Sequence, residues 1–344
     1  MTIPKTNRKI QIFLLFLLIT TFSVTACQKD ENSGQIPETP QPTATIIPTL
    51  APDRIVLVAA PDGNSTNLAE AQTLIPELAS SAGLAFETRP ELFENEITPD
   101  MKIVVFLKQP DNLGSLSTTS PDTQFVAISD QVWNPTPNTT IIQLREDHTA
   151  FLAGYISAML APNFRVGAML VSEETSQNQS FRNGVNYYCG MCAAKVFPLN
   201  TYPFIAELPA NTPAANWQTS FNEINANTIN VLYLDDDVVS TELSNFLAAQ
   251  EIALVGNQEP IAEAQSRWTV TIIPDPIKPI YEIWPDLISG QGGNIVTADL
   301  KINNYNYISL QDGLVWLSEG KLKLVNEVIG LLREGQIYTS PILN

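Results

Sequence analysis

The chain has 344 residues, and its 36 aspartates and glutamates outnumber its 18 lysines and arginines, so the formal net charge is −18. A strongly acidic chain repels phosphate backbones, and we therefore expect no nucleic-acid partner. The excess of acids is typical of a soluble, exposed surface.

The N-terminus has the three parts of a signal peptide. Residues 1–9 carry Lys5, Arg8 and Lys9 without an acid, the apolar run IQIFLLFLLITTF follows, and small residues precede Cys27. The run is shorter than the roughly 20 residues of a membrane-spanning helix, which favours a cleaved signal over an uncleaved anchor. Removal of residues 1–26 takes away these three cations and no acid, so the net charge changes from −18 to −21.

Val24, Thr25 and Ala26 precede Cys27, and this stretch resembles the lipobox of bacterial lipoproteins. The resemblance implies that Cys27 becomes the lipidated first residue of the mature chain, carrying palmitate or similar acyl groups. Two or more acyl chains hold a protein stably at a membrane. We therefore expect a lipid-anchored protein that faces the extracytoplasmic side of the cell membrane.

Residues 28–53 are punctuated by prolines among Thr, Glu and Gln, and such a segment cannot bury a core. We expect an extended tether here. Roughly 290 residues remain after it, which is enough for two domains of ordinary size.

From Arg54 onward, short apolar strands alternate with segments of helical periodicity. Before residue 144 the pattern predicts strands at 54–60, 84–89, 101–107, 124–129 and 140–144, and a helix at 67–83 that ends on Gly83. After it, the pattern predicts helices at 146–161, 176–190, 238–251, 277–290 and 322–335, and strands at 165–171, 229–234, 252–256, 268–273, 305–310 and 312–317.

This alternation indicates an α/β fold of two doubly wound parallel-sheet domains around an interdomain cleft. We expect an N-terminal domain over residues 54–144, a second domain over 145–260 and a return segment, 261–344, that completes both. The signal peptide (1–26) and the tether (27–53) precede them.

Three stretches resemble the basic membrane protein (BMP) family of ABC-transporter substrate-binding lipoproteins. They are REDHTAFLAGYISAMLAPNFRVGAML at 145–170, FRNGVNYYCG at 181–190, and the segment from ISGQGGN to GQIYTSP at 288–341. The resemblance implies a type I periplasmic-binding fold in which the chain crosses between the domains three times. It also implies a nucleoside-like ligand, since members of the family commonly bind purine nucleosides.

The predicted function is a membrane-tethered solute-binding protein that captures a small molecule and passes it to an ABC permease. The alternative is a ligand-binding sensor or scaffold lipoprotein without a transport role. We expect a monomer, and we expect no enzyme, because no nucleophile–base pair is present. We also expect no cofactor and no metal site.

Ligands of open α/β sheets lie beyond the carboxyl ends of the strands. Polar and aromatic residues at predicted strand ends, with one near a helix start, are the candidate ligand-binding residues: Asp62, Asn64, Asp130, Trp133, Glu173, Trp217, Asp235, Asp236, Asn257 and Gln258. Each carboxylate could instead cap a helix or a turn. Three consecutive acids in LDDDVV could hold calcium, but acids at the start of a helix are the favoured interpretation.

His148, the only histidine, is predicted to be a surface residue in the first turn of a helix. Cys189 and Cys192 form a CxxC pair at the end of the helix predicted at 176–190. Because disulfides persist outside the cytoplasm, a Cys189–Cys192 disulfide that ends this helix is favoured over free buried thiols.

Overall fold

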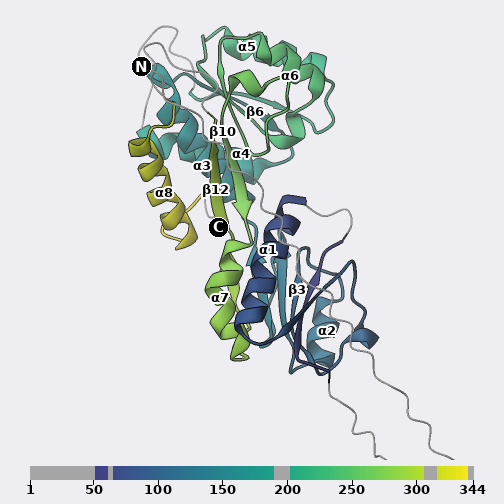
Figure 1. The fold of residues 1–344 in the computed structure, drawn as a ribbon. Coiled ribbons are helices and arrows are strands. Elements are labelled where there is room, and N and C mark those ends of the chain that lie inside the picture. The colour runs from purple at the N-terminus through teal and green to yellow at the C-terminus, as the bar shows by residue number, and fades with distance from the viewer. Residues whose placement is uncertain (1–50, 61–64, 190–201, 306–315, 340–344) are drawn as a thin grey trace, which may run out of the picture. The chain divides into compact units, whose positions relative to one another are not determined.

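The computed structural model of the protein describes residues 51–60, 65–189, 202–305 and 316–339. Their helices and strands belong to one compact unit, Leu50–Asn344. They build two sheets, each covered by helices on both faces (Figure 1).

The first sheet has the strand order β11-β5-β4-β3-β1-β2, and all of its pairs are parallel. Its strands are β1 (Arg54–Val58), β2 (Ala85–Arg89), β3 (Met101–Phe106), β4 (Gln124–Ser129), β5 (Thr139–Gln143) and β11 (Ile295–Thr297). Apolar side chains alternate between its two faces. Ile55 and Leu57 pack under α1 (Ser65–Ser81) and α7 (Lys278–Ile288), whereas Val56 and Val58 pack under α2 (Leu113–Thr119).

The second sheet has the order β12-β10-β9-β8-β6-β7, and β10 with β12 is its antiparallel pair. Its strands are β6 (Val166–Val171), β7 (Phe204–Leu208), β8 (Val231–Leu234), β9 (Ala253–Gly256), β10 (Trp268–Asp275) and β12 (Asp299–Asn304). One face packs against α3 (Glu146–Leu160), α4 (Thr175–Cys189) and α8 (Glu319–Arg333). The other packs against α5 (Ala214–Asn225) and α6 (Thr241–Ala248).

The chain passes between the two sheets three times: from β5 to α3, from β10 to α7, and from β11 to β12. Helix α7 therefore lies beside α1 over the first sheet, although the two are far apart in the sequence (Figure 1). The predicted fold class, an α/β fold of two parallel-dominated sheets, is confirmed. The domain boundaries proposed from the sequence stay a prediction.

The elements predicted from the sequence are present wherever the structure describes their residues in full. Gly83 has the positive φ expected of a residue that ends α1. Four helices and strands were not predicted, α2, β7, β11 and β12, and for α5 the sequence indicated only a helix start near Trp217. Of these, α2 is rich in Ser and Thr, β11 has three residues, and β12 is a half-exposed edge strand of largely polar sequence. The strands predicted at 305–310 and 312–317 lie, except for Tyr305, Trp316 and Leu317, outside the described residues.

Helix α3 is buried on every side, as expected of a helix whose sequence is apolar all round. It crosses α4 at a pair of glycines. A Cβ atom on Gly154 would lie less than 3.0 Å from the backbone oxygen of Phe181, and one on Gly184 would lie equally close to that of Phe151. The two backbones can approach this closely only because neither position carries a side chain.

We predict that Gly154→Ala lowers the free energy of unfolding by about 1–3 kcal/mol, because the new methyl group overlaps backbone that must shift. The matched control is Gly330→Ala in α8, where a Cβ meets nothing within 4 Å. That change should leave stability unchanged or raise it by about 0.5–1 kcal/mol. Urea unfolding of both variants tests this, and equal effects would contradict the close crossing.

Candidate ligand-binding site

The crossing of α3 and α4 brings the first turns of the two helices together. Glu146 begins α3, Gln177 lies in the first turn of α4, and the Gln177 Nε2 donates a hydrogen bond to Glu146 Oε2. Both turns face the carboxyl ends of β8 and β9, where they enclose a cavity of about 340 Å³. This edge of the sheet is where parallel α/β folds bind ligands.

Carboxylates dominate the lining of this cavity. They come from the start of α3, the loop before α4 and the turn after β8: Glu146, Glu174, Asp235, Asp236 and Asp237. Of the described residues that line the cavity, none is a lysine, arginine or histidine. The five acids, which we call the acidic cluster, therefore face one another without a cation.

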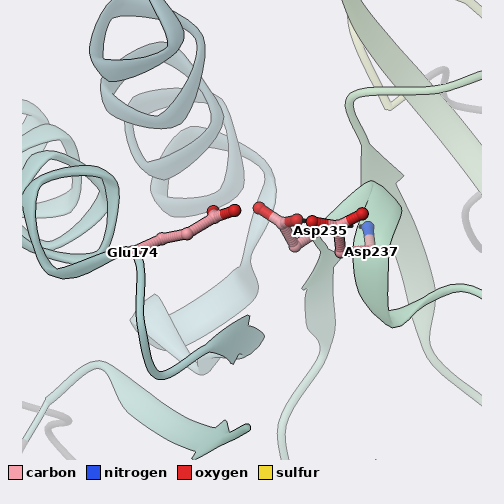
Figure 2. A group of neighbouring side chains, drawn as sticks. All are labelled: Glu174, Asp235 and Asp237. Atoms are coloured by element: carbon pink, nitrogen blue, oxygen red, sulfur yellow. Dashed lines mark hydrogen bonds between the residues drawn. The ribbon is translucent and has the colours of Figure 1, made fainter. Parts of the chain in front are cut away.

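Three members of the acidic cluster lie especially close. Glu174, Asp235 and Asp237 each offer one carboxylate oxygen, and these oxygens all lie within 4.8 Å of one another. Figure 2 shows the Glu174 side chain reaching from the α4 side toward Asp235 at the end of β8. Such separations fit oxygens arranged around one cationic centre.

Burial and the charges of neighbouring acids raise the pKa of three members of the acidic cluster, Glu146, Glu174 and Asp235. Burial, followed by the charges of Asp237 and Glu146, raises the pKa of Glu174 to about 7. Burial and the neighbouring Asp236 and Glu174 likewise raise the pKa of Asp235 well above its ordinary value. Two like charges that share a site disfavour each other's ionised form. At neutral pH, the repulsion between these carboxylates therefore raises the free energy of the folded, ligand-free chain.

The backbone compensates only part of this charge. Asp235 accepts a hydrogen bond from the Asp237 N–H at 3.3 Å and so caps the 3₁₀ turn Asp236–Val238. Helix α6 begins later and is capped by Ser240, which accepts from the Leu243 N–H at 3.2 Å. The acids of LDDDVV thus start a short 3₁₀ turn and lie outside α6, whereas the favoured interpretation of that sequence placed them at the start of the following helix.

A second cavity, of about 670 Å³, lies where the chain passes between the sheets. Arg145 there donates to both carboxylate oxygens of Asp147, at 2.8 and 2.7 Å. Asp147 also accepts a hydrogen bond from Thr339, and the Thr339 carbonyl accepts from Asn183 Nδ2 at 2.7 Å. Its charges are therefore largely paired, in contrast to the acidic cluster.

His148 lines this second cavity but is only 5% exposed. The prediction of a surface histidine is wrong, because α3 is buried on all sides from His148 onward and only Glu146 and Asp147 before it contact solvent. Burial, aided by the charge of Arg145, lowers the pKa of His148 to about 4. The imidazole is therefore neutral at physiological pH.

The structure brings some of the predicted site residues together. Asp235, Asp236 and Asn257 line the smaller cavity, where Asn257 Nδ2 donates to Asp236 Oδ1 at 2.7 Å. Asp130 lines the larger one.

Other predicted site residues line neither cavity. Glu173 is exposed and accepts hydrogen bonds from its neighbours Ser172 and the Ala210 N–H. Trp217 is 3% exposed and packs in the core under α5 and α6, while Trp133 packs against the core under α2. The backbone oxygen of Gln258 accepts from Thr271 at 2.9 Å.

Asp62, Asn64, Cys27 and Cys192 lie outside the described residues, as does the side chain of Cys189. Cys189 is the last residue of α4, which is where the sequence predicted the helix to end. The disulfide stays a prediction. Among the described residues, no helix is long and apolar enough to cross a membrane.

Sequence reasoning selected three of the eleven residues that line the smaller cavity, and those that it missed include Glu146, Glu174, Gln177, Asp237 and Tyr233. A signal was present for three of them, since Glu146 lies shortly after the strand β5, Glu174 adjoins the selected Glu173, and Asp237 adjoins the selected Asp236. Nothing in the sequence indicated that Tyr233 lines a cavity, because it lies within a buried strand and its pattern predicts a core residue.

Many solved structures share the fold, and two of them illustrate the likeness. The chain is similar to an ABC transporter solute-binding protein from Conexibacter woesei DSM 14684, with 14% identity, a TM-score of 0.57, and coverage of 83% of this chain and 97% of that one. It is also similar to a transcriptional activator of the comK gene from Bacillus halodurans, with 11% identity, a TM-score of 0.56, and coverage of 83% and 99%. At these identities the likeness shows the fold, which is the type I periplasmic-binding fold.

No model of a known protein family matches the sequence, and no curated protein matches it significantly.

We predict that the stability of the ligand-free chain falls as the pH rises from the ordinary carboxyl range to about 7. A raised pKa means that the folded state binds more protons than the unfolded state in this window, so loss of protons favours unfolding. One such carboxyl contributes at most about 1.4 kcal/mol per pH unit. Glu174→Gln should therefore flatten the dependence.

Urea unfolding at pH 5, 6, 7 and 8 measures this effect. The groups that face Glu174 are all acids: Glu146, Glu173, Asp235, Asp236 and Asp237. The buried His148, whose pKa is lowered to about 4, opposes the trend below about pH 6.5, but it does so equally in the wild type and in both variants. Asp235→Asn should raise stability most at the highest pH. Equal slopes for the wild type and both variants would contradict the stored repulsion.

Proposed function

We propose that this chain is a membrane-tethered, extracytoplasmic solute-binding protein that captures a small molecule and delivers it to an ABC permease. The observation that carries the proposal is the cavity at the carboxyl ends of β8 and β9, lined by residues from five separate segments. The fold shared with an ABC transporter solute-binding protein is consistent with this role. The signal-like N-terminus and the lipobox-like Cys27 support the tether.

The nucleoside-like ligand is a finer part of the proposal and comes from the sequence resemblance. Ribose hydroxyls are donors, and the carboxylates of Glu174 and Asp235 are acceptors that could pair with them. Buried polar groups of a ligand must find such partners to bind tightly. The proposal includes no catalytic residue and no catalytic step.

We predict that at least one purine nucleoside raises the melting temperature of the full chain purified in detergent, because a ligand that binds only the folded state stabilises it. Asp235→Asn should reduce the shift, since an amide replaces an acceptor oxygen at the cavity floor by a donor. The measurement is a thermal-shift screen against nucleosides, sugars and amino acids.

A shift with sugars or amino acids alone would contradict the nucleoside part and retain solute binding. The absence of any shift across the three classes, together with the absence of a shift with the diamine putrescine, would contradict solute binding itself.

A second candidate is a ligand-binding sensor or scaffold lipoprotein without a permease. The observation that favours it is the equal likeness of the fold to a transcriptional activator, at a TM-score of 0.56. Affinity purification from crosslinked membranes separates the two. Recovery of a permease and its ATPase supports transport, and a ligand-binding chain that recovers neither supports the sensor.

A further inference from the structure

We propose that the solute of this cavity carries at least one protonated amine, which binds between Glu174, Asp235 and Asp237. This inference rests on the proposed function and names the charge of the solute. It follows from what the cavity offers to a ligand and from what it leaves unpaired.

The amide side chains of the cavity are fixed by the acids beside them. Asn257 Nδ2 donates to Asp236, and Gln177 Nε2 donates to Glu146. A carboxylate accepts and cannot donate, so each amide must turn its nitrogen to the acid and its oxygen away. The two amide oxygens, Asn257 Oδ1 and Gln177 Oε1, are buried and have no hydrogen-bond partner among the described residues.

The floor of the cavity contains a further unpaired group. Tyr233 lines the cavity although it is only 1% exposed, and its ring stacks on Phe181 at 5.1 Å between centroids. No described residue forms a hydrogen bond with its hydroxyl. Because Tyr233 lines the cavity, a ligand bound there can pair with this hydroxyl as well as with the two buried amide oxygens, whose unpaired state is costly and uncommon.

The side-chain groups left unpaired, the hydroxyl of Tyr233 included, are all able to accept hydrogen bonds, and the acids add negative charge. No ion pair in the described part of the chain involves a member of the acidic cluster. A matching ligand must therefore donate several hydrogen bonds and bring positive charge. An ammonium group does both, with three N–H donors on one centre.

The size of the cavity favours an organic amine over a bare metal ion. Three carboxylate oxygens within 4.8 Å could also surround a divalent cation. However, the cavity holds about 340 Å³, which is far more than an ion fills, and falls in the range of small-molecule pockets. The unpaired amide oxygens of Gln177 and Asn257 come from different elements and fit a ligand of several atoms.

The test is isothermal titration of the full chain in detergent with four probes. Putrescine is the amine, 1,4-butanediol is its uncharged counterpart of equal length, CaCl₂ is the metal alone, and adenosine is a neutral nucleoside. We expect putrescine to bind at least tenfold more tightly than butanediol. Glu174→Gln and Asp235→Asn should each weaken putrescine at least tenfold.

Glu173→Gln is the matched control, because Glu173 adjoins Glu174 in sequence but lines neither cavity, and its affinity for putrescine should equal that of the wild type. If calcium binds more tightly than putrescine and through the same acids, the proposal of an amine ligand is overturned and the site is a metal site. Binding of adenosine without putrescine overturns the amine and leaves solute capture intact. If none of the four probes binds, the amine is overturned, and the broader thermal-shift screen separately decides solute capture.

Discussion

The close crossing of α3 and α4 is the contact on which the candidate site depends. Gly154 and Gly184 let the two backbones approach to a separation that any side chain would prevent. The crossing places the first turns of both helices over the ends of β8 and β9, and so gathers Glu146 and Glu174 beside Asp235. The close packing of α3 on α4 in the core thus determines which carboxylates line the cavity at the edge of the sheet.

That charge is unusual beside the other buried or half-buried aspartates of the described residues, such as Asp299, which pairs with Lys278. Asp147, which adjoins Glu146 in the sequence, is held by Arg145 and Thr339. The acidic cluster has amide and backbone donors only, and burial together with the neighbouring acids raises the pKa of Glu174 to about 7. A site that destabilises its own empty state gains affinity for whatever neutralises it, since binding relieves the repulsion.

Much of the fold could be predicted from the sequence, because short apolar runs indicated most strands of both sheets and helical periodicity indicated most of the helices that cover them. The positions of Asp235, Asp236 and Asn257 also followed from the rule that parallel strands end at one edge. The positions of the first turns of α3 and α4 could not be predicted from this rule. They depend on how the two helices cross, and that crossing is set by the close approach of their backbones at Gly154 and Gly184. Trp217 illustrates the same limit: an aromatic residue near a helix start can face a cavity or the core, and here packing under α5 and α6 decided for the core.

The central claim is that the acidic cluster lacks a compensating cation until a solute supplies one. The most direct measurement is a ¹³C NMR titration of the Glu174 carboxyl carbon in the ligand-free chain, with Glu174→Gln to assign the signal. The account predicts a midpoint near pH 7. A midpoint in the ordinary glutamate range, about 4.3, would contradict it.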